Sequence, residues 1–192
     1  MYRTAVAAVF LTALVIIAAD LVFRLRRRSE VPRGTVAAAP SPALRWLRIA
    51  VNIVGLVSFA FIAITGFSAL LDEHGMTGDR LIWHVAFAPA FAIAAVATTL
   101  FWAHRNRFAS ADWSSLRPGT WALPLRKFFF WAAAVLAVPT LVSILLAMLP
   151  LAGTDDQQTL FLIHRCSAAL LAGAGLLFAY FAVVAWRERS LD

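Results

Sequence analysis

Five apolar stretches dominate this chain of 192 residues, and each is long enough to cross a lipid bilayer. A helix needs about 20 mostly apolar residues to span the roughly 30 Å hydrocarbon core. Hydrophobic residues make up 62% of the chain and charged residues only 14%, whereas soluble domains carry about 45–50% and about 25%. The sequence therefore predicts an all-α integral membrane protein and excludes a soluble globular domain. The five predicted transmembrane helices cover residues 4–23, 49–71, 81–103, 128–151 and 160–186.

The distribution of positive charge predicts how these helices are oriented. All Lys and Arg except Arg3, Arg80 and Arg165 lie after the first stretch, between the third and fourth, or in the C-terminal tail. These segments share one side of the membrane, and cytoplasmic loops carry an excess of Lys and Arg. We therefore expect a multi-pass protein of the bacterial inner membrane with its N-terminus outside and its C-terminus in the cytoplasm. The asymmetry accounts for the formal charge of +7 without a nucleic-acid partner.

Three parts follow from this pattern. Residues 1–28 form an N-terminal transmembrane helix with a basic flank, residues 29–45 a cytoplasmic linker, and residues 46–192 a four-helix bundle. Asp20 is the only charge in the first stretch, and we expect it to pair with Arg24 one turn later. No segment outside the membrane is large enough for a soluble catalytic domain, so any chemistry lies within the bundle.

The bundle consists of two repeated hairpins, with a histidine at the same place in each. The second and third apolar stretches form one hairpin, and the fourth and fifth form the other. A shift of 80 residues superposes His84 on His164. Each histidine follows an acidic outer turn by about one to two helical turns. We therefore expect two imidazoles at matching depth near the outer face.

Ionisable residues inside a membrane span are costly and mark functional sites by default. A hydrogen bond between helices is the alternative role for each histidine. Two histidines on repeat-related helices favour a shared ligand, and haem b is the natural one, because its iron accepts an axial Nε2 from each side. Arg80 and Arg165 lie beside His84 and His164 and are candidate partners of the haem propionates through charge-assisted hydrogen bonds.

The other two histidines, His104 and His74, are predicted to lie away from the His84–His164 site. His104 is about 30 Å beyond His84 along the helix, at 1.5 Å per residue, and faces the opposite way, so it cannot share the same iron. It is either part of a solvated basic edge or a contact for quinone or a lipid headgroup. His74 lies in an outer turn, exposed to solvent or in contact with a partner or a propionate. The chain has one cysteine, Cys166, and no HExxH, GxSxG or phosphate-binding loop, while tryptophans such as Trp121 suit an interfacial aromatic belt.

Several short motifs occur in a characteristic order along residues 45–186. They are Thr65-Gly66 at the end of one helix, His84 at the start of the next, Arg-Lys-Phe-Phe-Phe-Trp at 126–131, and Leu-Ile-His ending at His164. In these motifs the chain resembles the cytochrome b (gamma) subunits of membrane-bound formate dehydrogenases. That family is related to the cytochrome b of nickel–iron hydrogenases and to bacterial cytochrome b561. The first predicted helix is an addition to the family's four-helix core.

The resemblance implies that His84 and His164 ligate an outer haem b. The family also holds an inner haem on two further histidines, and the matching positions here are Asn52 and Phe178. Phe cannot ligate iron and Asn is a poor haem ligand, so we expect one haem b and no inner haem. Asn52 then either forms a hydrogen bond across the bundle or meets a quinone carbonyl.

Together these features predict a membrane electron-transfer subunit of a respiratory oxidoreductase complex, not catalytic on its own. It would pass electrons between a periplasmic redox partner, of molybdopterin, iron–sulfur or multihaem c type, and the quinone pool. One alternative is a haem-free membrane anchor. Another is a small transporter that uses His84, His164 and His104 as a proton or metal path. Their wide axial separation, with no carboxylates between them, argues against the transporter.

Overall fold

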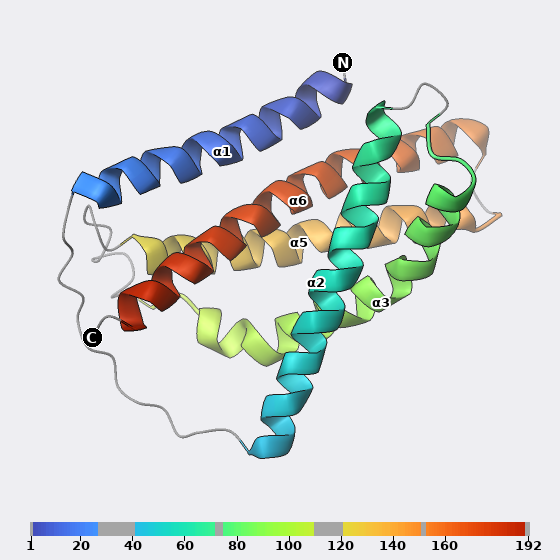
Figure 1. Cartoon of the computed structure of the whole chain (residues 1–192). Helices are drawn as coiled ribbons and strands as arrows, with labels where there is room; N and C mark the ends of the chain where they lie inside the picture. The colour runs from blue at the N-terminus through green and yellow to red at the C-terminus, as the bar shows by residue number, and fades with distance from the viewer. Residues whose placement is uncertain (1, 27–40, 72–74, 110–120, 151–152, 191–192) are drawn as a thin grey trace. The chain divides into compact units, whose positions relative to one another are not determined.

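The computed structural model describes residues 2–26, 41–71, 75–109, 121–150 and 153–190. Every regular element in these ranges is a helix, which confirms the predicted all-α class for the described part of the chain. The elements are α1 (Tyr2–Arg26), α2 (Pro42–Leu71), α3 (Asp79–Trp102), the short 3-10 helix η1 (Ala103–Asn106), α5 (Ala122–Met148) and α6 (Thr154–Ser190) (Figure 1).

Four of the helices are long and apolar enough to cross a membrane, namely α2, α3, α5 and α6. Their apolar segments run for 27 to 32 residues, which exceeds the 20 or so that a bilayer needs. Large apolar side chains on them are exposed, for example Leu56 at 71% and Ile93 at 73%, as suits a helix surface in contact with lipid. In α1 the apolar segment within the described residues is Val6–Val22. A fifth crossing by α1 stays a prediction.

The helices form two compact units. The first lies within Met1–Thr35 and Asn106–Asp192 and contains α1, α5 and α6, and the second lies within Val36–Arg105 and contains α2 and α3. In each unit the two helices of a predicted hairpin pack together, α5 on α6 and α2 on α3. Most of the predicted linker, at residues 27–40, lies outside the described residues.

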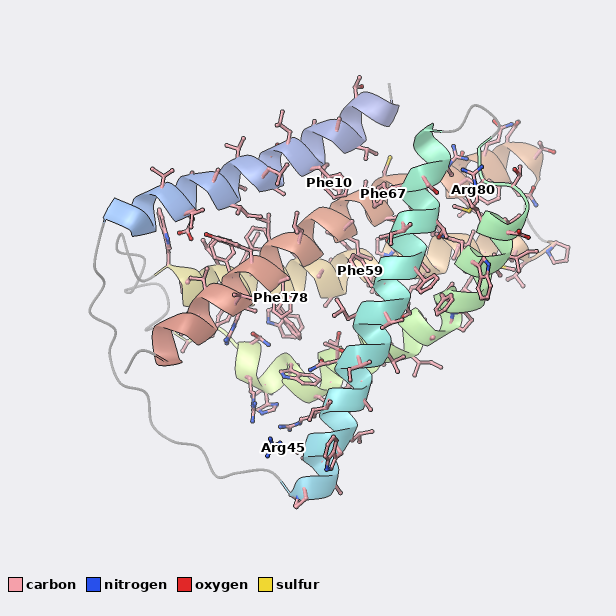
Figure 2. All side chains as sticks on the ribbon, viewed as in Figure 1. Phe10, Arg45, Phe59, Phe67, Arg80 and Phe178 are labelled. Atoms are coloured by element: carbon pink, nitrogen blue, oxygen red, sulfur yellow. The ribbon has the colours of Figure 1, made fainter. Side chains whose placement is uncertain are left out.

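Close approach of the helices α2 and α3 depends on a small residue and on aromatic pairs. A Cβ added to Gly55 would lie 3.3 Å from the Cβ of Ala94. Further along the pair, Phe61 stacks on Phe87 with ring centroids 4.3 Å apart. Phe59, labelled in Figure 2, lies 5.8 Å from the ring of Phe91. Small residues at a helix interface let backbones approach, which is how helices associate in a membrane.

Helix α1 packs against the α5–α6 hairpin. Its Ala13 belongs to a buried apolar cluster with Ala122 of α5 and with Leu177 and Phe181 of α6. Nearer the start of α1, a Cβ on Gly173 would fall 2.7 Å from Val9 Cγ1, so glycine is what allows α1 to lie this close to α6. The first helix is therefore part of the packed unit, a relation that the sequence did not indicate.

A buried carboxyl group joins these three helices. Asp20 of α1 is only 4% exposed. Its Oδ1 accepts a 2.6 Å hydrogen bond from the indole Nε1 of Trp121, and its Oδ2 accepts a 2.8 Å hydrogen bond from the hydroxyl of Tyr180 on α6. The sequence linked Asp20 only to Arg24, whose side chain lies outside the described residues. The structure shows that Asp20 has two partners far away in the sequence.

We expect Asp20→Ala to destabilise the unit formed by α1, α5 and α6, because it removes the acceptor of both hydrogen bonds. Each hydrogen bond contributes about 0.5–1.5 kcal/mol, so a clear fall in the thermal midpoint of the detergent-purified protein should follow. Thr12→Ala is the control, since it removes a hydroxyl of the same helix that bonds only along the helix, to Ala8 O at 2.8 Å. Equal midpoints for Asp20→Ala and the wild type would contradict the assignment.

Candidate functional site

His84 of α3 is anchored to α2 within its own hairpin. Its side chain is half-buried, and its Nδ1 lies 3.0 Å from Oγ1 of Thr65. The next residue, Gly66, lies against the same ring, because a Cβ added there would be 3.3 Å from Cε1 and 3.7 Å from Nδ1 of His84. The Thr65-Gly66 motif therefore forms the surface on which the His84 imidazole rests.

The hydrogen bonds of Thr65 favour one position for the proton of His84. Thr65 Oγ1 donates to the carbonyl oxygen of Phe61 at 2.7 Å. With its proton engaged there, Oγ1 can accept a hydrogen bond from Nδ1 of His84. A neutral ring in this arrangement carries its proton on Nδ1. The lone pair of this tautomer is on Nε2.

His164 of α6 is held in the same way by α5, the other helix of its own hairpin. Its Nδ1 lies 2.8 Å from the main-chain carbonyl oxygen of Thr140. Because the carbonyl has no proton to give, Nδ1 donates, and in a neutral ring the lone pair is then on Nε2. The side chains next to this contact are also bonded, with Thr140 Oγ1 donating to Ser167 Oγ at 2.9 Å.

The two repeated hairpins thus share one arrangement, an imidazole anchored through Nδ1 to a threonine of the preceding helix. A histidine that ligates a metal through one nitrogen commonly donates its other N–H to a carbonyl or another acceptor, which fixes the tautomer and the ring orientation. The sequence identified Thr65 only as part of the Thr65-Gly66 motif and did not identify Thr140. A signal was present, since each is a threonine in an apolar helix that precedes a histidine-bearing one.

His84 and His164 lie at different distances from the starts of their helices. His84 lies five residues after the start of α3 at Asp79, whereas His164 lies ten residues after the start of α6 at Thr154. At 1.5 Å per residue these are about 7.5 and 15 Å. Asp155 and Asp156 form the first turn of α6, where the helix dipole favours acidic side chains. These distances are counted from the helix starts and not from a membrane surface, so a matching depth near the outer face stays a prediction.

Arg80 and Arg165 lie at different positions on their helices relative to His84 and His164. Arg80 lies in the first turn of α3 (Figure 2), half-buried, four residues before His84. Residues four apart share one face of a helix, so Arg80 is on the face of His84. Arg165 follows His164 directly and is exposed on α6, about 100° around the helix from it. A role of either arginine toward haem propionates stays a prediction.

The remaining candidate residues are Asn52, Phe178 and His104, predicted for the inner side of the membrane, and His74, predicted for an outer turn. Asn52 is exposed on α2, and among the described residues it makes no hydrogen bond to α3, so its contact with a quinone stays a prediction. His104 is exposed in η1, past the end of α3. Phe178, labelled in Figure 2, packs against Phe130 of α5 with ring centroids 5.9 Å apart. His74 lies outside the described residues.

The Lys–aromatic–Trp motif at 126–131 has a packing role in the first unit. The indole Nε1 of Trp131 donates a 2.8 Å hydrogen bond to the carbonyl oxygen of Asn106. Lys127 is buried near the start of α5, at 9% exposure. This motif therefore connects α5 to the segment that precedes it, and nothing in these contacts makes it a ligand site.

Each histidine is anchored separately, within its own hairpin. Among the described residues, no group of three or more His, Cys, Asp and Glu side chains lies together as a metal-ion site. Nδ1 of His84 and Nδ1 of His164 each contact an oxygen of a neighbouring helix, which is the anchoring that a haem-ligating histidine commonly has. A haem held by both histidines stays a prediction.

Comparisons of the chain with protein-family models, curated proteins and solved structures find no match. The functional assignment therefore depends on the residues of this chain and on their geometry.

We expect Gly66→Ala to displace the His84 ring, because the new Cβ would lie 3.3 Å from Cε1. The measurement is the nitrogen NMR spectrum of the histidine rings in the full-length protein, in which the His84 signals should shift. Gly55→Ala is a matched control, since it places a Cβ equally close to Ala94 in the same helix pair. Overpacking costs about 1–3 kcal/mol in both variants, but only Gly66→Ala should move the ring signals. Identical shifts in the two variants would show that Gly66 has no specific relation to His84.

Proposed function

We propose that this protein is an electron-transfer subunit of the bacterial inner membrane that carries one haem b near the periplasmic side. In this proposal His84 and His164 are the axial ligands of the iron. The chain passes electrons between a periplasmic oxidoreductase and quinone in the outer leaflet, and it is not catalytic on its own.

The observation that carries the proposal is the matching contact of the two histidines. Nδ1 of each ring lies at hydrogen-bond distance from an oxygen of a threonine on the neighbouring helix, at 3.0 Å for His84 and 2.8 Å for His164. A neutral ring that donates from Nδ1 has its lone pair on Nε2, the nitrogen that a haem ligand of this kind uses. Helix–helix hydrogen bonding is the alternative role of each histidine. The repetition in both hairpins favours a shared ligand.

Bound haem supplies reversible one-electron chemistry, and the chain supplies the ligands and their surroundings. Thr65 and Thr140 fix the ring orientation of His84 and His164. Arg80 and Arg165 are the proposed cationic partners of the propionates. The apolar helices exclude water from the ligands, which influences the reduction potential.

A single outer haem defines the electron path that we propose. Asn52 and Phe178 stand where the family has its inner ligands, and Phe178 packs against Phe130. Electrons would therefore enter and leave on the periplasmic side. The acidic outer loops would face a partner of molybdopterin, iron–sulfur or multihaem c type. The excess of Lys and Arg on the other side supports a cytoplasmic C-terminus and an outside N-terminus.

Histidine variants test the proposal. We expect a reduced-minus-oxidised spectrum of a b-type cytochrome and one haem per chain in the purified protein. His84→Ala and His164→Ala should each lose most of the haem, because each removes an axial ligand. His104→Ala is the matched control and should retain it, since His104 is exposed beyond the end of α3.

Other outcomes would count against this proposal in different ways. Two haems per chain would show that Asn52 and Phe178 do not mark a lost site. Absence of haem from protein made in haem-supplied cells would favour the alternative, a haem-free membrane anchor. Loss of haem in His104→Ala but not in His84→Ala would contradict the ligand assignment.

A further inference from the structure

We propose that Thr65 is a positioning residue for His84: its hydroxyl holds the imidazole in the Nδ1–H tautomer and increases electron donation from Nε2. The part of this inference that concerns the ring stands on the geometry of α2 and α3 alone. The part that concerns a reduction potential rests on the proposed function.

The hydrogen bonds of Thr65 support this assignment. His84 Nδ1 lies 3.0 Å from Thr65 Oγ1, and Thr65 Oγ1 donates to Phe61 O at 2.7 Å. A second carbonyl, that of Ile62, lies 3.2 Å from the same Oγ1. A helical threonine commonly bonds back to a carbonyl three or four residues earlier. Both of these acceptors compete for the hydroxyl proton, so Thr65 offers His84 an acceptor and not a donor.

Gly66 restricts the ring from the side of the α2 backbone. The position of a missing Cβ at Gly66 is 3.3 Å from Cε1 of His84, so the imidazole packs directly on the helix. The hydrogen bond at Nδ1 and this contact at Cε1 fix two atoms of the same ring. Rotation of the imidazole about its bond to Cβ would break both.

The α5–α6 hairpin allows a comparison, because its histidine has a different kind of partner. His164 donates to the main-chain carbonyl of Thr140, an acceptor that no side-chain substitution removes. The hydroxyl of Thr140 bonds to Leu136 O and Ser167 Oγ instead. Thr65→Val and Thr140→Val are therefore chemically identical substitutions of half-buried or buried helical threonines. Only the first removes the acceptor of a histidine.

The chemical consequence follows from the proton on Nδ1. When Nδ1–H donates to an acceptor, the ring gains basicity, and Nε2 becomes a stronger electron donor to a metal. Stronger donation stabilises ferric over ferrous iron and lowers the midpoint potential. Valine has the shape of threonine but no acceptor, so Thr65→Val should raise the potential.

The first experiment measures the tautomer by nitrogen NMR of histidine-labelled, full-length protein prepared without haem. We expect the wild type and Thr65→Ser to show His84 with its proton on Nδ1, and Thr65→Val to shift it toward Nε2–H. Thr140→Val should leave His164 and His84 unchanged. An unchanged His84 tautomer in Thr65→Val would overturn the inference. If Thr65→Val does not fold, Thr65→Ala serves in its place.

The second experiment measures the midpoint potential of the haem-containing protein by redox titration. A positive shift in Thr65→Val, recovery of the wild-type value in Thr65→Ser and no shift in Thr140→Val support the inference. An unchanged potential in Thr65→Val with normal haem content would overturn the proposed effect on the iron. Absence of haem from the wild type would instead overturn the proposed function, and the tautomer measurement would still decide the role of Thr65.

Discussion

Hydrocarbon offers no hydrogen-bond partner to a polar group, and this constraint accounts for most of what is specific in the structure. The backbone satisfies it by forming helices, in which main-chain donors and acceptors pair within one segment. A polar side chain in such a helix bonds either to a carbonyl of its own helix, as Thr12 does to Ala8, or to a group on a neighbouring segment. Asp20 bonds to Trp121 and Tyr180, His84 to Thr65, and His164 to Thr140. The contacts that hold Asp20 and the two histidines in place are therefore those that polar groups require.

The same constraint gives the two histidines a defined chemistry. A neutral ring that donates from Nδ1 has its lone pair on Nε2. The two hairpins hold Nδ1 by different routes, through the hydroxyl of Thr65 in one and the main chain of Thr140 in the other. A side-chain substitution can therefore remove the partner of His84 but not that of His164.

Hydropathy did not predict the residues at which the helices begin. The apolar pattern predicted helices from residues 49, 128 and 160, whereas α2, α5 and α6 begin at Pro42, Ala122 and Thr154. Each helix continues beyond its apolar stretch because main-chain hydrogen bonding does not need apolar side chains. In α6 the added turn contains Asp155 and Asp156, whose charge suits a helix N-terminus. His164 is therefore ten residues from the start of its helix.

The sequence by itself determined the helical, apolar character of the chain, the pairing of helices into hairpins and the presence of one histidine in an apolar helix of each hairpin. Hydropathy and spacing carry that information because they depend only on residue type along one segment. Only the tertiary structure decided that α1 packs on α5 and α6, that Asp20 bonds to residues 101 and 160 positions away, and that Thr65 and Thr140 face the imidazoles. These pairings depend on the rotation and axial position of each helix against its neighbour. A shift of one residue turns a side chain by about 100°, and no pattern within a single segment specifies that value.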